Sequence, residues 1–116
     1  MHLKNFSMFL SPMGWVLSPF YDLLNVKLVL PKDKDDLALI LGGKKRNFNK
    51  GYFDRLGKLL KLNDKQMNGV YKRLANWLPK AQDLIDISFL SHDRKEAYKK
   101  LITERIKTIN EGEMVE

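Results

Sequence analysis

An amide and a carboxylate near the start of the chain, Asn5 and Asp22, are the side chains whose chemistry is easiest to interpret. Their oxygens suit Mg²⁺, which binds few protein oxygens and completes its shell with substrate phosphates and water. Protein kinases hold metal ions in this way, through an Asn of the catalytic loop and an Asp after a short hairpin. The alternative is structural, because Asn and Asp also form turns at strand ends.

A turn between the two residues would bring them together. The segment Ser11-Pro12-Met13-Gly14 lies between apolar-rich stretches, and its Pro and Gly predict a β-hairpin. If this turn is the hinge, residue 10 faces residue 15 and residue 5 falls opposite residue 20. The open end of the hairpin would then hold Asn5 close to Asp22, which makes the pair a candidate Mg²⁺ site.

The first part of the chain, residues 1–41, carries strand-like patterns. We expect the hairpin strands at Leu3 to Leu10 and at Trp15 to Ser18, followed by a stop at Pro19. A further strand is predicted at Val26 to Leu30. Leu37 to Leu41 is predicted to form a short apolar strand or a buried turn.

The second part, residues 49–110, has the period of amphipathic helices. Asn49 is a plausible N-cap for a helix from Lys50 to Leu62, and Asn63 for a second one. Pro79 lies inside the second pattern and should kink or divide that helix. A third helix should start after Ser91. The residues expected to face inward are Phe53, Leu56, Leu59, Leu60, Met67, Val70, Tyr71, Leu74, Trp77, Leu78, Ala81, Ile85, Ala97, Leu101, Ile102, Ile106 and Ile109.

These patterns predict an α+β fold that is mainly α, with a short hairpin and loops followed by a bundle of three or four helices. We expect one domain over residues 1–110 and a frayed tail at 111–116. The strands are too few for a complete layer, so the first 40 residues suggest part of a larger sheet or site.

Composition narrows the classes of function. The 116 residues contain no cysteine, which excludes a disulfide framework and a Cys-type zinc site and suggests a cytoplasmic protein. No apolar run approaches the ~20 residues of a membrane span, and the first residues do not resemble a signal peptide. The net charge is +7, and we interpret it as a solvated lysine-rich surface. Binding to a nucleic acid, an acidic protein or an anionic lipid is the alternative interpretation, and it stays open.

A basic turn follows at Gly42-Gly43-Lys44-Lys45-Arg46. Its amides and side chains could bind phosphate, but the spacing of a P-loop is missing. A solvated basic turn is the preferred interpretation.

Three segments together resemble HipA-like serine/threonine kinases, the toxins of HipA–HipB toxin–antitoxin modules. They are His2-Leu3-Lys4-Asn5-Phe6-Ser7, Leu17-Ser18-Pro19-Phe20-Tyr21-Asp22-Leu23-Leu24, and the run from Leu37 to Asn47. The resemblance covers essentially the whole chain. The first two segments look like the catalytic loop and the metal-binding segment of that family, and their combination is more specific than either alone.

The resemblance implies roles for four residues. The family pattern Asp-x-His-x-Lys-Asn matches at His2, Lys4 and Asn5, with Met1 as the first x. It implies that Asn5 and Asp22 bind Mg²⁺, that Lys4 lies near the transferring phosphate, and that His2 shapes the loop. The catalytic Asp would precede Met1, so we expect a C-terminal fragment, from an internal start or a split gene, that is inactive alone.

The resemblance also implies cofactors and partners. The complete enzyme would use ATP and Mg²⁺, neither of which the fragment need bind, to phosphorylate a protein of the translation machinery. Its partners would be a HipB-like antitoxin or a separately encoded N-terminal half, with DNA contacted only indirectly and no membrane. The alternative is a non-catalytic binding module for an antitoxin, DNA or that half. A non-functional remnant is a third possibility, and exposed apolar residues such as Phe9 and Trp15 predict self-association.

Overall fold

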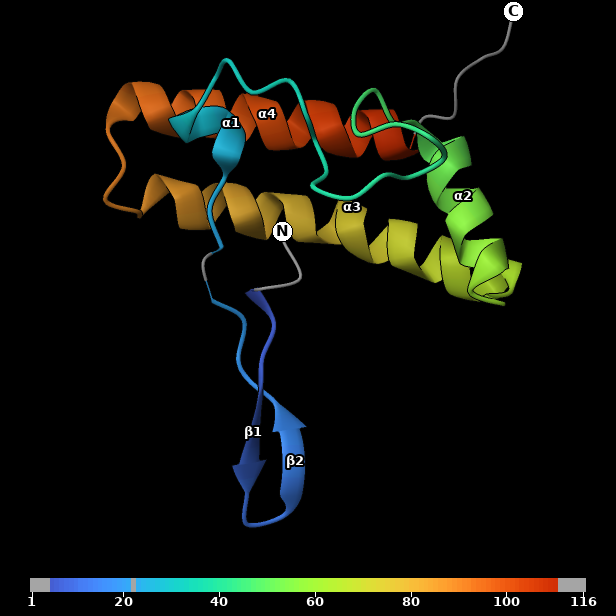
Figure 1. Ribbon diagram of the computed structural model, residues 1–116. Coiled ribbons are helices and arrows are strands. Elements are labelled where there is room, and N and C mark those ends of the chain that lie inside the picture. The colour runs from blue at the N-terminus through green and yellow to red at the C-terminus, as the bar shows by residue number, and fades with distance from the viewer. Residues whose placement is uncertain (1–4, 22, 111–116) are drawn as a thin grey trace, which may run out of the picture. The chain divides into compact units, whose positions relative to one another are not determined.

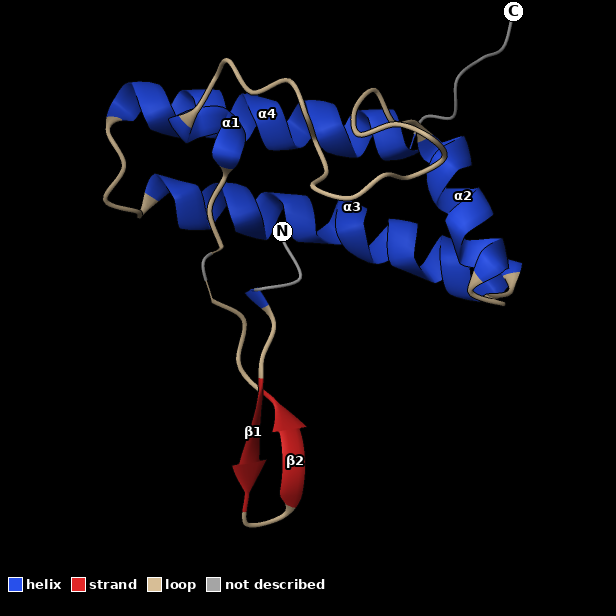
Figure 2. Cartoon of the chain, in the orientation of Figure 1, coloured by secondary structure: helices blue, strands red, loops and turns tan. Residues whose placement is uncertain are grey.

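The structure is a computed structural model that describes residues 5–21 and 23–110, and its element order is β1, β2, α1, α2, α3 and α4 (Figure 1). The chain forms two units, Met1–Asn47 and Phe48–Glu116. The first unit holds the strands and a one-turn helix, and the second holds three longer helices (Figure 2). The predicted class, α+β and mainly α, is therefore confirmed.

The hairpin of the first unit has the predicted hinge. Strand β1 (Met8–Ser11) pairs antiparallel with β2 (Gly14–Leu17), and Leu10 lies opposite Trp15. Gly14 has a φ of 107°, which favours glycine because a Cβ is strained there. The Ser11 hydroxyl locks the turn, since it accepts from the Met13 amide at 3.1 Å and donates to the Gly14 carbonyl at 2.9 Å. β1 is shorter than the predicted strand, part of which lies outside the described residues.

The predicted strand at Val26 to Leu30 is wrong, because this segment forms the one-turn helix α1 (Val26–Val29). The Leu30 amide closes the turn by donating to the Val26 carbonyl at 2.7 Å. Lys27 then donates to the Asp33 carbonyl at 2.8 Å and lies 3.6 Å from the Asp36 carboxylate. A strand needs a neighbouring strand, whereas these contacts satisfy the segment locally.

The segment Leu37 to Leu41 is not a strand either. Its end forms a tight turn in which Leu41 and Lys44 make an isolated bridge around Gly42 and Gly43, both with positive φ. Leu39 and Ile40 are more than half exposed, so the predicted burial of this segment is also wrong for them. The burial prediction failed because this short apolar run does not alternate with polar residues, and such alternation is what identifies a half-buried strand.

In the second unit, all three predicted helices are present. Helix α2 (Lys50–Leu59) crosses one end of α3 (Asp64–Asp86), and α4 (His92–Asn110) lies alongside α3 (Figure 1). The prediction allowed Pro79 to divide this helix, but α3 continues through it as one element. The helix has buried residues on both sides of the proline, Met67 before it and Ala81 and Ile85 after it.

The core of this unit is small. Four hydrophobic side chains among the described residues are buried, and they are Met67, Ala81, Ile85 and Ile106. Val70 and Trp77 were predicted to face inward but are exposed, because α4 covers a narrower face of α3 than the apolar pattern suggested. The same prediction is wrong for Leu59 and Leu60 at the end of α2 and for Ala97 on α4.

The turn from α2 to α3 is tightly hydrogen-bonded. Lys61 adopts a left-handed φ of 59°, which lets the Leu62 amide donate to the Gly57 carbonyl at 2.9 Å. Asn63 and Gln66 then form a capping box, in which each side chain accepts from the other residue's amide at 2.9 Å. The predicted Asn63 cap is confirmed, whereas Asn49 precedes α2 without a side-chain capping bond.

Candidate metal centre

The pairing of the hairpin continues past the two strands toward the predicted metal site. The Ser18 amide donates to the Ser7 carbonyl at 2.8 Å, and the Ser7 hydroxyl donates to that of Ser18 at 3.0 Å. Beyond this pair, the rings of Phe6 and Phe20 meet edge to face with centroids 5.8 Å apart. The register that opposes Leu10 to Trp15 is thus kept as far as Ser7 and Ser18, and the contact of Phe6 with Phe20 is a diagonal one beyond it.

Asn5 is the predicted site residue that the structure describes. It is partly exposed and immediately precedes Phe6, so it lies at the open end of the hairpin. His2, Lys4 and Asp22 lie outside the described residues. Within the described ranges, no cluster of three or more His, Asp or Glu side chains could hold a metal ion. The Mg²⁺ site formed by Asn5 with Asp22 stays a prediction.

The basic turn uses backbone amides in local bonds. The Lys44 amide donates to the Leu41 carbonyl at 3.3 Å, and the amides of Asp36 and Leu37 both donate to the Lys45 carbonyl. The turn's own Lys44 amide therefore already has an acceptor, and the Lys45 carbonyl ties the turn to residues 36 and 37, which favours a turn that is stabilised internally.

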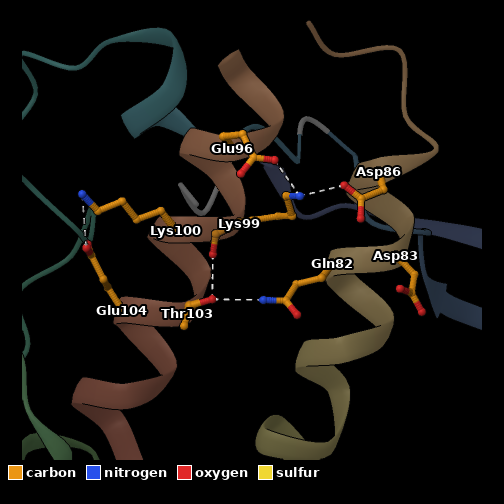
Figure 3. Close-up of a pocket in the computed structure, with 8 residues that line it drawn as sticks. All are labelled: Gln82, Asp83, Asp86, Glu96, Lys99, Lys100, Thr103 and Glu104. Atoms are coloured by element: carbon orange, nitrogen blue, oxygen red, sulfur yellow. Dashed lines mark hydrogen bonds and ion pairs between the residues drawn. The ribbon is translucent and has the colours of Figure 1, made fainter. Parts of the chain in front are cut away.

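A polar groove between α3 and α4 was not predicted from the sequence (Figure 3). It is lined by Gln82, Asp83, Asp86, Glu96, Lys99, Lys100, Thr103 and Glu104. Lys99 lies 2.7 Å from a Glu96 oxygen and 2.9 Å from an Asp86 oxygen, and these two bonds, Glu96 first, raise the pKa of Lys99. Together with the bond that Gln82 donates to the Thr103 hydroxyl at 3.2 Å, the pair of Lys99 and Asp86 links the two helices across the groove.

A second polar cluster joins α2 to α3. The Tyr71 hydroxyl donates to Asp54 at 2.7 Å, and Lys50 donates to the other Asp54 oxygen at 2.8 Å while lying 4.7 Å from the Tyr71 ring centroid. The Lys50 hydrogen bond lowers the pKa of Asp54, and burial together with the Asp54 bond raises the pKa of Tyr71 to about 12. Sequence periodicity marked Tyr71 as a core residue and gave no signal for its hydroxyl partner.

One family model matches a range of residues that includes the hairpin region. The model of the HipA-like C-terminal domain matches residues 1–82, well over half of the chain. That range includes the hairpin, α1, α2 and most of α3, whereas α4 follows it. No curated protein matches the chain. Among the described residues, no helix has both the length and the apolar character that crossing a membrane requires.

Proposed function

Because the chain belongs to the family of HipA-like C-terminal domains, we propose that it supplies the metal-binding part of a serine/threonine protein kinase. The kinase would use ATP and Mg²⁺ to phosphorylate a protein of the translation machinery. It would act in the cytoplasm as the toxin of a toxin–antitoxin module, with a HipB-like antitoxin as its restraining partner.

The hairpin register is the observation that carries this proposal. It is kept from the turn to the bond between Ser7 and Ser18. Continued by two more residues, the same register would bring Asn5 opposite Phe20, two residues before Asp22. An amide oxygen and a carboxylate at one end of a hairpin are the protein ligands that kinases use for Mg²⁺. The hairpin is thus suited to hold two ligands that are distant in sequence.

Each site residue has a role in this proposal. Asn5 and Asp22 would hold Mg²⁺, Lys4 would lie near the transferring phosphate, and His2 would shape the loop that carries Asn5. The bound metal neutralises charge on the phosphates during transfer to the substrate hydroxyl. The proposal therefore assigns metal binding, and not acceptance of the hydroxyl proton, to the residues named here.

Metal binding can be tested on the chain itself by NMR. Mn²⁺ would be added as a paramagnetic probe to isotope-labelled protein, and line broadening should concentrate on the amides around Asn5 and Asp22. Asp22→Asn should remove this local broadening, whereas Asp33→Asn, a matched change in an exposed loop residue, should leave it intact. Broadening that is uniform along the chain, or equal in both variants, would contradict the metal site.

Kinase activity requires a separate test on the protein as its source cells make it. Transfer of phosphate from ATP to serine or threonine should depend on Mg²⁺ and should be lost in Asp22→Asn while Asp33→Asn retains it. Activity that is indifferent to Asp22 would argue against the proposed site even if the protein proved to be a kinase.

A binding module is the second candidate function, and the exposed hairpin favours it. Large apolar side chains on both strands are about half exposed or more; they are Met8, Phe9, Leu10, Trp15 and Leu17. Such a surface is typical of a segment that another polypeptide covers. If this is the main function, the isolated chain should self-associate, and a monomeric sedimentation profile over a wide concentration range would count against it.

A further inference from the structure

An apolar stripe runs along α3 beside its buried face and is formed by Val70, Trp77 and Leu84. These residues are 44%, 49% and 65% exposed, respectively. They follow one another at intervals of seven residues, almost two helical turns, so they fall on one line along the helix. The buried residues of α3, Met67, Ala81 and Ile85, lie on a neighbouring line, and the contacts within the second unit leave the stripe itself about half exposed.

The stripe has a basic border on its solvent side. Arg73 and Lys80 each lie three residues after a stripe residue, and both are exposed. Neither has an ion pair or hydrogen-bond partner among the residues that the structure describes. Lys99, by contrast, is held between two carboxylates at the interface of α3 and α4. The positive charge beside the stripe is therefore available to a partner.

We propose that this stripe is the docking site for an amphipathic helix of a different polypeptide, in which acidic residues flank the apolar face. A seven-residue interval is the one at which a second helix meets the same face repeatedly. The stripe extends over residues 70–84, or about 21 Å, which a partner helix of roughly 15 residues would cover. Acidic flanks would complement Arg73 and Lys80, and Trp77 at the centre would be the anchor.

A second copy of this chain fits the stripe less well. If two α3 helices paired antiparallel about Trp77, the same border of each helix would meet its counterpart. Arg73 of one copy would then lie against Lys80 of the other, and like charges in this position repel. A single-stranded nucleic acid also fits less well, because Val70 and Leu84 offer no aromatic surface for stacking bases.

The inference does not depend on the proposed kinase function, and it can be tested on the full chain with a designed helical peptide of about 20 residues. One peptide would carry leucines at the seam and glutamates at the flanking positions, and its counterpart would carry lysines in place of the glutamates. Calorimetry should detect binding of the glutamate peptide and binding at least about tenfold weaker for the lysine peptide.

Paired variants locate the binding surface. Trp77→Ala should weaken binding by about tenfold or more, and the double variant Arg73→Glu, Lys80→Glu should do the same. The matched control is Lys65→Glu, Lys72→Glu, which makes the same charge change at exposed positions of α3 away from the stripe. It should bind the glutamate peptide normally. Circular dichroism would verify that each variant keeps its helices.

Several outcomes would overturn the inference. They are no binding of the glutamate peptide, equal binding of both peptides, or an equal loss in the control variant. A dimer of the chain that Trp77→Ala dissolves would instead identify a second copy as the occupant. Tighter binding of a single-stranded oligonucleotide than of the glutamate peptide, through the same residues, would identify a nucleic acid.

Discussion

Tyr71 combines a half-buried ring with a hydroxyl that donates to a carboxylate, and this combination decides its response to pH. Its folded-state pKa of about 12 lies above the ordinary value of 10, so folding favours the neutral phenol. The resulting stabilisation is complete below the unfolded-state pKa and is lost as pH rises through the folded-state pKa. The free energy of unfolding should therefore fall between about pH 10 and 12.

The ultraviolet absorbance of the phenolate measures this titration, and the difference between the parent protein and Tyr71→Phe isolates it. Asp54→Asn should lower the pKa of Tyr71 only partly, because burial is the larger cause. A difference curve with its midpoint near 10 would contradict the contact.

At acid pH the same contact depends on Asp54, whose pKa is lowered in the folded state. The contribution of Asp54 to the free energy of unfolding is present above its ordinary pKa of 3.8 and is lost as pH falls through the folded-state pKa.

Lys61 occupies a backbone conformation that suits glycine. Its φ of 59° is left-handed, where a Cβ costs roughly 1 kcal/mol or more. We expect Lys61→Gly to raise the free energy of unfolding by about 0.5 kcal/mol in urea titrations, since some of the gain is offset by extra freedom in the unfolded chain. Lys58→Gly, inside the last turn of α2, should lower it by roughly 1 kcal/mol. Similar effects at both positions would contradict this account.

Sequence reasoning at the residue scale succeeded where the chemistry is local. Asn63 was identified as a cap because the bond it makes, to residue 66, spans only three positions. The partner of Tyr71 lies seventeen positions away, and no periodicity predicts which hydroxyl meets which carboxylate. Asn5 and Asp22 were predicted as metal ligands from the resemblance as well as from the turn, and their joint site stays a prediction.

At the scale of elements, the capping box sets where α3 begins. Replacing Asn63 with Ala removes the acceptor for the Gln66 amide, and we expect a loss of about 1 kcal/mol in the free energy of unfolding. Asn68→Ala, the same change at an exposed position inside α3, should be neutral or slightly stabilising because Ala is the better helix former. Thermal unfolding followed by circular dichroism would compare the two. Equal losses would show that the cap contributes nothing special.

Helices α2 and α3 approach closely at Gly57, which is buried against Met67. A Cβ at Gly57 would overlap the Met67 sulfur, so Gly57→Ala should destabilise by about 1–3 kcal/mol although Ala ordinarily favours a helix. The double variant with Met67→Ala should lose less than the sum of the two single variants. Additive losses in chemical denaturation would contradict the contact. Gly69→Ala, where a Cβ meets open space, is the matched control.

The helices were predictable because each has a sustained period and a recognisable boundary. Residues 26–41 were not, because their apolar runs are short, and local bonds such as that from Lys27 to Asp33 decided the outcome. Periodicity also identified the apolar face of α3 correctly, but it could not show that α4 covers only one side of that face. Val70 and Trp77 were therefore predicted to be buried and are exposed.

For the molecule as a whole, the division into two units predicts that they differ in their ability to fold alone. Residues 48–110 contain three helices, the small core and both interhelical polar clusters, so we expect them to fold as a separate chain. Residues 1–47 hold one two-stranded hairpin, which is marginal in water without further packing. Circular dichroism should therefore show cooperative unfolding of the 48–110 chain, and hydrogen exchange in the full chain should be fastest in the hairpin. An unfolded 48–110 chain would contradict this division.

Each unit contains one of the two tryptophans, with Trp15 on β2 and Trp77 on α3. Both side chains are about half exposed or more. Each unit thus carries its own fluorescent reporter. Trp15→Phe would leave an emission signal from the helical unit, and Trp77→Phe would leave one from the hairpin. Two denaturation midpoints from these variants would mean that the hairpin can rearrange while the helices stay intact, and a single midpoint would mean that the two units share one folding transition.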